Sequence, residues 1–110
     1  MKKFGQIIKL RPEHYETYKK AHADVWPGVL ARIHASNIRN YSIYHYNGLM
    51  FAYFEYVGSD FEADMAAMAA DSITQKWWEW MEPMQEPVPE AGEQDWWVNM
   101  EMLFDLGEES

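Results

Sequence analysis

The 110-residue sequence contains no cysteine. This absence excludes disulfide bonds, thiolate nucleophiles and zinc sites built on cysteine, and it is compatible with a reducing compartment. Basic side chains are also scarce, because nine lysines and arginines stand against 18 aspartates and glutamates, which gives a formal net charge of -9. A field of this sign repels nucleic acid, anionic lipid and highly phosphorylated ligands. The composition therefore favours an uncharged small molecule as the ligand.

Long apolar runs and the common catalytic motifs are missing as well. No window approaches the roughly 20 apolar residues of a membrane span, and the apolar run of the N-terminal MKKFGQIIKLRPEH is too short for a signal peptide. His-Glu-x-x-His, a glycine-rich phosphate loop and Gly-x-Ser-x-Gly do not occur, and His14, His34 and His45 lack ligand-like spacing. We therefore expect a soluble, cytoplasmic protein with no metal and no nucleic-acid or membrane partner.

The first half of the chain predicts a strand, a divided helix and a hairpin. Residues Lys3 to Leu10 form a short β-type run, and the following Pro12 suits the start of a helix. From Glu13 the apolar residues recur at helical spacing, with a hinge expected near Asp24 to Pro27. Between residues 37 and 58 the period changes to two, and Asn47-Gly48 separates two β-rich runs, which predicts a β-hairpin.

The second half predicts two helical segments and a last strand. Ser59-Asp60-Phe61-Glu62 matches a capping box, and a second helical segment is expected from Asp71 or Ser72. The proline-containing stretch from Glu86 to Gln94 is expected to be a loop, and Trp97 to Leu106 alternates loosely like a strand.

The resulting order, βαββαβ, predicts one α+β domain of ferredoxin-like architecture over residues 1–110. In this fold a four-stranded antiparallel sheet carries its helices on one face. The second face is then bare, so we expect a homodimer that packs through it, as in a dimeric α+β barrel. Six tryptophans and seven tyrosines exceed what a core of this size needs, and we expect the tryptophans to contribute to that interface.

The stretch YKKAHADVWPG, residues 18–28, raises the question of a catalytic group. Tyr18 and His22 are four residues apart and therefore lie on nearly the same helix face, so both could line one pocket wall. A histidine before Trp-Pro is also common at the C-terminal end of a helix, and spacing alone favours that structural role. Tyr41 falls in a strand, and Trp77-Trp78 point about 100° apart on a helix, so that one can face the core and the other a ligand.

The combination of these motifs is more specific than any one of them. Over roughly the first 80 residues the sequence resembles the L-rhamnose mutarotase family in the order of Tyr18, His22, Trp26-Pro27, Asn40-Tyr41-Ser42-Ile43-Tyr44 and Lys76-Trp77-Trp78 with Met81. The resemblance implies a dimeric ferredoxin-like fold that acts on a monosaccharide without a cofactor. It also implies that His22 is the proton donor and that Tyr18, Tyr41, Trp77 and Trp78 bind the sugar.

The chemistry of mutarotation suits these residue types. The pyranose ring opens when its ring oxygen is protonated and the anomeric hydroxyl loses a proton, and histidine, with an unperturbed pKa of about 6.5, exchanges protons near neutral pH. The C-terminal Met102 to Leu106 departs from the Glu-Val-Phe-Tyr-Leu typical of the family and follows an unusual Trp96-Trp97. L-fucose or another 6-deoxy sugar is therefore an alternative substrate.

Two other functions are compatible with the predicted fold. Dimeric α+β barrels of this size also host cofactor-free oxygenases and haem-degrading enzymes, an analogy that rests on the fold alone. A non-catalytic sugar-binding module is the third possibility, although a binding site needs no group that titrates near neutral pH.

Overall fold

The computed structural model describes residues 1–92 and 96–107. Its elements, in chain order, are β1 (Lys2–Leu10), the 3-10 turn η1 (Pro12–His14), α1 (Tyr15–Ala23), α2 (Pro27–Ala35), β2 (Ile38–Tyr46), β3 (Leu49–Tyr56), α3 (Phe61–Ala70), α4 (Ser72–Met81), the 3-10 turn η2 (Glu82–Met84), β4 (Gln85–Glu86) and β5 (Val98–Asn99).

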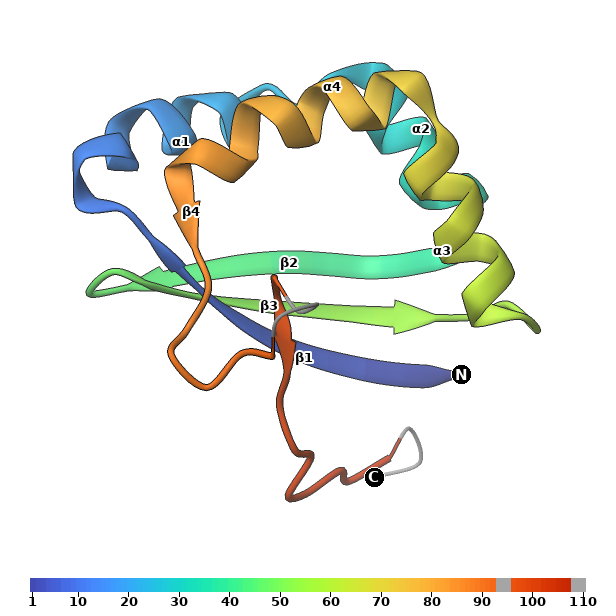
Figure 1. Cartoon of the computed structure of the whole chain (residues 1–110). Coiled ribbons are helices and arrows are strands. Elements are labelled where there is room, and N and C mark those ends of the chain that lie inside the picture. Colours follow the sequence, from blue (N-terminus) through green and yellow to red (C-terminus); the bar gives the residue numbers. More distant parts are fainter. Residues whose placement is uncertain (93–95, 108–110) are drawn as a thin grey trace.

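The strands form an antiparallel sheet in the order β2-β3-β1-β4, with β5 also paired to β1. The four α-helices lie together over one face of this sheet, and the chain after β4 descends past its other face (Figure 1). This is the predicted ferredoxin-like arrangement, with each predicted helix divided in two. The fold class is therefore confirmed.

Side-chain alternation along β3 decides which face is buried. Met50, Ala52, Phe54 and Tyr56 are buried, whereas the residues between them are only partly covered. Because successive side chains of a strand point to opposite faces, the buried set faces the helices. The larger of two core clusters then joins strand residues to helix residues, and it consists of Ile8, Leu10, Tyr18, Ala21, Val29, Met50, Trp77, Met81 and Met84.

The predicted hairpin is confirmed at Asn47-Gly48. Both residues have positive φ angles, 50° and 81°, and this is the geometry of the two-residue turn that suits the twist of paired strands. Asparagine and glycine tolerate this region of backbone space better than other residues. The turn therefore sets the register in which Tyr46 pairs with Leu49.

A β-bulge in β2 changes which side chains face the helices. The register shifts between Arg39 and Ser42, and Asn40 lies in the left-handed region with φ of 52°. Ile38 is buried, so strict alternation would turn residue 41 away from the helices. The extra residue reverses the alternation, and the ring of Tyr41 instead lies 5.6 Å from the ring of buried Phe54.

The hinge predicted near Asp24 to Pro27 is confirmed. Helix α1 ends at Ala23, and α2 begins at Pro27 with Trp26 as its N-cap. The 3-10 turn η1 occupies residues 12–14, so the regular helix starts at Tyr15 rather than at Glu13. Pro27 at the first helical position loses no hydrogen bond there, because that N–H has no partner within a helix.

Asp60 and Asp71 cap the next two helices. The Asp60 carboxylate accepts from the backbone N–H of Ala63, so the cap of α3 is Asp60 and not Ser59, the first residue of the predicted capping box. The Asp71 carboxylate accepts from the Thr74 backbone N–H and hydroxyl, which starts α4 at Ser72, as predicted. Each cap satisfies backbone donors that the first helical turn leaves unpaired.

The prediction for the C-terminal third is partly wrong. The edge of β1 opposite β3 carries two short strands: Gln85–Glu86, at the start of the predicted loop Glu86 to Gln94, pairs with Lys9 and Leu10, and Val98–Asn99, inside the predicted last strand, pairs with Gln6 and Ile7. Of the predicted last strand only Val98–Asn99 is regular, while residues 100–107 form neither helix nor strand. Residues 93–95, which include the predicted end of the loop, lie outside the described residues. Prolines at 83, 87 and 89 flank the short β4 and limit its length.

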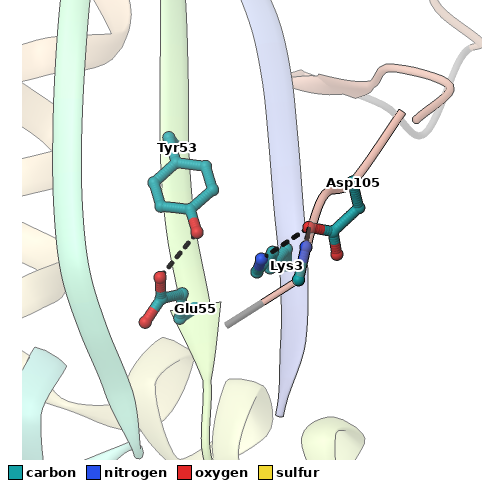
Figure 2. Close-up of polar contacts among 5 residues, drawn as sticks. Lys3, Tyr53, Glu55 and Asp105 are labelled. Atoms are coloured by element: carbon teal, nitrogen blue, oxygen red, sulfur yellow. Dashed lines mark hydrogen bonds and ion pairs between the residues drawn. The ribbon is translucent and has the colours of Figure 1, made fainter. Parts of the chain in front are cut away.

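The sheet face away from the helices carries tyrosines and the C-terminal segment, residues 96–107. Figure 2 shows Lys3 of β1 bonded to Asp105 of this segment, beside the Tyr53–Glu55 hydrogen bond of β3. A hollow of about 450 Å³ lies where the segment passes Gly5 and Tyr53. Trp26, Trp77 and Trp80 pack with one another in the helix layer, whereas Trp96 and Trp97 belong to the C-terminal segment, so the contribution of tryptophans to an interface on this face stays a prediction.

Candidate active site

A cleft of about 410 Å³ opens between α1 and β2. Its volume lies within the usual range for a small-molecule site. Tyr18 and His22 reach it from α1, and His45 from β2. The complete lining is Leu10, Tyr15, Tyr18, Lys19, His22, Ala23, Ile43, Tyr44, His45 and Met50.

The His22 ring is held in one orientation on three sides. Its Nδ1 lies 2.9 Å from the backbone carbonyl oxygen of Tyr18, one helical turn earlier. The ring also stacks on the Tyr18 ring at 4.2 Å and meets the Trp77 ring edge-on at 5.4 Å. A carbonyl oxygen only accepts, so Nδ1 carries a proton and Nε2 is the nitrogen that gains or loses one.

Burial sets the protonation of this imidazole. Desolvation lowers the pKa of His22 below its ordinary value, and the hydrogen bond to the Tyr18 carbonyl opposes the shift without reversing it. The imidazolium, when it forms, is consequently a stronger acid than free histidine. It is also a smaller fraction of the protein at neutral pH.

The Tyr18 hydroxyl lies at the buried end of a hydrogen-bond chain that begins at the partly exposed Trp96. The Nε2 amide of Gln85 donates to the Tyr18 hydroxyl oxygen at 2.9 Å, and the indole N–H of Trp96 donates to Gln85 Oε1 at 2.6 Å. Tyr18 and Gln85 are both buried. Burial raises the pKa of Tyr18, and the bond from Gln85 partly offsets the rise. The phenol is thus neutral and hydrogen-bonded across the physiological pH range.

Tyr41 brings a second phenol near the first. Desolvation of its hydroxyl, with the nearby Tyr18 as a smaller cause, raises the pKa of Tyr41 to about 12. The residue as a whole is 40% exposed, and its ring packs against buried Phe54. The bulge at Asn40 is what turns this side chain toward the helix layer. Tyr41 therefore presents a neutral hydroxyl that can donate or accept.

Trp77 forms the aromatic wall behind His22. It is buried, and Trp26 meets it edge-on at 5.1 Å while Trp80 does so at 5.5 Å. Trp26 and Trp80 stack on each other at 5.9 Å, so the hinge residue Trp26 ties the start of α2 to α4. This packing holds Trp77 against the imidazole.

The structure brings three of the five predicted site residues into direct contact, because the His22 ring lies against both Tyr18 and Trp77. Tyr41 packs against Phe54 instead, and Tyr18 contributes to the shift of its pKa. Trp78 is 38% exposed, and within residues 1–92 and 96–107 no ring contact or hydrogen bond of its side chain joins it to the other four. Trp77 is accordingly the core-facing member of the pair, and Trp78 the outward one.

Sequence reasoning missed Gln85, Trp96 and His45. Gln85 lies among prolines in a segment that resembled a loop boundary, and nothing local marks it as buried. The Trp96-Trp97 pair is unusual, but nothing in the sequence links Trp96 to the cleft. His45 lines the cleft and accepts from the backbone N–H of Gly48 at 3.2 Å, but it lacks the spacing of a metal ligand. Its alternation with Tyr41 and Ile43 along β2 was the available signal.

Comparison with known proteins identifies the family. Residues 3–106 match the family described as L-rhamnose mutarotase. The chain belongs to the L-rhamnose mutarotase family. The L-rhamnose mutarotase of Oceanobacillus iheyensis is 34% identical over 89 residues, which cover 78% of this chain and 82% of that protein. The L-rhamnose mutarotase of Lactiplantibacillus plantarum is 35% identical over 88 residues, with the same coverage.

Solved structures show the same fold. The crystal structure of an L-rhamnose mutarotase from Formosa agariphila superposes with a TM-score of 0.75 at 20% identity and covers 97% of this chain and 100% of that one. Tetracenomycin F2 cyclase from Streptomyces glaucescens, a type-II polyketide cyclase, superposes with a TM-score of 0.66 at 13% identity, covering 98% and 99%. The second likeness shows that this architecture is not restricted to mutarotases.

The family match confirms the resemblance that rested on Tyr18, His22, Tyr41 and the Trp77-Trp78 pair. Among the described residues no helix is long and apolar enough to cross a membrane. In the same part of the chain no group of three or more histidine, aspartate or glutamate side chains gathers in a way that could hold a metal ion.

Proposed function

We propose that the protein interconverts the α and β anomers of L-rhamnose or a closely related 6-deoxy sugar. One observation supports this most strongly: in a chain of the mutarotase family, His22 lines a cleft of suitable size with its Nδ1 tied to the backbone. Only Nε2 is then free to exchange a proton with a bound ligand. A fixed imidazole on a concave surface has the geometry that general acid–base catalysis requires.

In the proposed reaction, protonated His22 gives its Nε2 proton to the ring oxygen, and the anomeric hydroxyl releases its proton to a water molecule. The C–O ring bond breaks, the aldehyde carbon turns, and the reverse steps close the ring in the other configuration. Anomers already interconvert slowly in water, so the barrier to be lowered is modest. General acid–base catalysis of about 10² to 10⁴-fold is sufficient for such a step.

The neighbouring residues suit a neutral sugar. Tyr18 and Tyr41 offer hydroxyls that stay protonated, so they can donate to sugar oxygens. Buried Trp77 supports the apolar side of the site from behind His22, and Trp78, whose ring is partly exposed, is the one proposed to offer a ring face to the C–H surface or methyl group of a 6-deoxy sugar. The net charge of -9 and the lack of a phosphate-binding loop favour an unphosphorylated substrate.

We also propose that two copies associate through the sheet face away from the helices, in the cytoplasm. That face carries exposed tyrosines, and Leu103 and Phe104 of the C-terminal segment are 87% and 77% exposed. Such an apolar surface is unfavourable in water unless a partner covers it. The absence of cysteine is compatible with a reducing compartment.

The test is anomeric exchange of L-rhamnose, measured by saturation-transfer NMR with and without the protein. We expect a rate above that of buffer, and His22→Ala should return the exchange to the buffer rate. His34→Ala is the matched control, because His34 is exposed on α2 outside the cleft. Unchanged exchange in His22→Ala would contradict the assigned role. A panel that includes L-fucose identifies the preferred sugar.

The same samples separate the other two functions. A sugar-binding module would change the tryptophan fluorescence on adding L-rhamnose while exchange stayed at the buffer rate. An enzyme that degrades haem would shift the Soret band when haem is added, whereas we expect no shift.

A further inference from the structure

We infer that Gln85 and Trp96 are positioning residues that force the Tyr18 hydroxyl to donate its proton into the cleft. This inference rests on the proposed function, because it assigns Tyr18 a direction in sugar binding. It connects the C-terminal segment, which lies outside the cleft lining, to the site through two hydrogen bonds.

The indole of Trp96 fixes which groups donate and which accept in these two hydrogen bonds. The Trp96 indole nitrogen only donates, so the atom of Gln85 that it contacts at 2.6 Å must be the carbonyl oxygen Oε1. An amide of glutamine can otherwise be turned over without changing its shape. The contact with Trp96 removes this ambiguity and leaves Nε2 as the end that meets Tyr18.

The orientation of the Gln85 amide in turn fixes the role of the Tyr18 hydroxyl. The amide Nε2 carries two hydrogens and accepts nothing, so at 2.9 Å it donates to the Tyr18 hydroxyl oxygen. The hydroxyl cannot give its own proton back to Gln85. Because Tyr18 lines the cleft, that proton is available to an acceptor there, and a sugar oxygen is such an acceptor.

Burial of Gln85 and Tyr18 prevents water from replacing either hydrogen-bond partner. Gln85 is 6% exposed and Tyr18 is 5% exposed, so water does not substitute freely for a lost partner. Gln85 lies in β4, which pairs with the end of β1, and Trp96 comes 11 residues later in the sequence. Trp96 of the C-terminal segment thereby sets the hydrogen-bond direction of the Tyr18 hydroxyl on α1, although the two residues are far apart in the sequence.

The test is Gln85→Glu, which keeps the side-chain shape but replaces the donating amide by an accepting carboxylate. When ionised, that carboxylate accepts the Tyr18 proton and withdraws it from the cleft. We expect kcat/KM for anomer exchange to fall about tenfold relative to wild type at neutral pH, the effect of one lost hydrogen bond. The loss should shrink at low pH, where the carboxyl becomes protonated and donates again.

Two controls isolate this effect. Gln75→Glu adds the same charge at an exposed position on α4 and should leave kcat/KM within twofold of wild type. In a Tyr18→Phe background, Gln85→Glu should have almost no further effect, because there is no hydroxyl left to direct. An equal loss in both backgrounds would overturn the inference, since Gln85 would then act independently of Tyr18.

A second variant avoids placing a charge in the interior. Trp96→Phe keeps an aromatic ring but removes the indole N–H, so the Gln85 amide is free to turn over. We expect a smaller loss of kcat/KM, about threefold, with Trp97→Phe as the matched control. Loss in Trp97→Phe equal to that in Trp96→Phe would show that only packing is involved.

A readout without activity separates this inference from the proposed function. The ¹³Cζ chemical shift of Tyr18, assigned by its absence in Tyr18→Phe, reports the hydrogen bonding of the phenol. It should change in Gln85→Met and in Trp96→Phe but not in Gln75→Met. A constant shift overturns the inference even if exchange is catalysed. A changed shift in a protein that exchanges no aldose supports the hydrogen-bond direction and contradicts the proposed function alone.

Discussion

The Nδ1 atom of His22 donates a hydrogen bond of 2.9 Å to the backbone carbonyl oxygen of Tyr18. This single bond joins the two residues that the sequence separates by one helical turn. It gives the imidazole a defined tautomer, with Nε2 unprotonated in the neutral form. The same tyrosine then stacks beneath the imidazole, so that one residue orients the ring by both its backbone and its side chain.

The first prediction concerns pH. Burial lowers the pKa of His22, so the imidazolium required of a proton donor is lost as pH rises through a value below the ordinary 6.5. We expect kcat/KM for L-rhamnose exchange to decrease toward high pH, with an apparent pKa below 6.5. The measurement is saturation-transfer NMR across pH 4.5 to 8, corrected for the buffer rate. A rate that instead increases through this range would assign His22 the role of base.

The second prediction concerns Tyr18→Phe. This change removes the hydroxyl that faces the cleft and leaves the buried amide of Gln85 without its acceptor. We expect a loss of stability of about 1–3 kcal/mol and a tenfold or greater decrease of kcat/KM. Urea unfolding and exchange kinetics measure the two effects. Tyr46→Phe, at an exposed tyrosine on the far face of the sheet, is the control and should change neither quantity.

The third prediction separates the two neighbouring tryptophans. Trp77→Ala removes a buried ring that three aromatic neighbours contact, and it should cost about 3–5 kcal/mol of stability. Trp78→Ala removes a partly exposed ring and should change stability by less than about 1 kcal/mol. If Trp78 binds the sugar as proposed, its loss raises KM with little change in kcat. An unchanged KM would remove Trp78 from the binding site.

The fourth prediction concerns the bulge at Asn40. Its φ of 52° is tolerated by asparagine and glycine but strains a β-branched residue. Asn40→Val should therefore destabilise the protein by about 1–3 kcal/mol and raise KM, because the bulge aims Tyr41. Asn40→Gly is the matched control that accepts the same φ and should retain KM. Equal KM values for the two variants would show that the bulge does not position Tyr41.

The fifth prediction concerns assembly. Phe104→Asp places a charge on the exposed apolar C-terminal segment and should convert a dimer into a monomer at micromolar concentration. Sedimentation velocity measures the change. Leu30→Asp is the control, because Leu30 is similarly apolar and exposed but lies on α2 in the helix layer. A wild-type protein that is already monomeric, or a dimer that withstands Phe104→Asp, would contradict association through this segment.

Local sequence signals determined much of the fold. Period-two alternation on both sides of Asn47-Gly48 predicted the β2-β3 hairpin, and helical spacing with Pro27 predicted the break between α1 and α2. These features depend on backbone preferences of neighbouring residues, which is why a single sequence suffices to detect them. The pairing of Tyr18 with His22 on one helix face is of the same kind, because it follows from 3.6 residues per turn.

Only the tertiary structure decided which of these residues share a site. The bulge at Asn40 turned Tyr41 inward, and burial against His22 distinguished Trp77 from the outward Trp78. Local alternation predicted one strand over Trp97 to Leu106, but the edge of β1 opposite β3 carries two short strands. Val98–Asn99 pairs with Gln6 and Ile7, and Gln85–Glu86 pairs with Lys9 and Leu10. That pairing placed Gln85 beside Tyr18, 67 residues away, a contact for which neither residue carries a local signal.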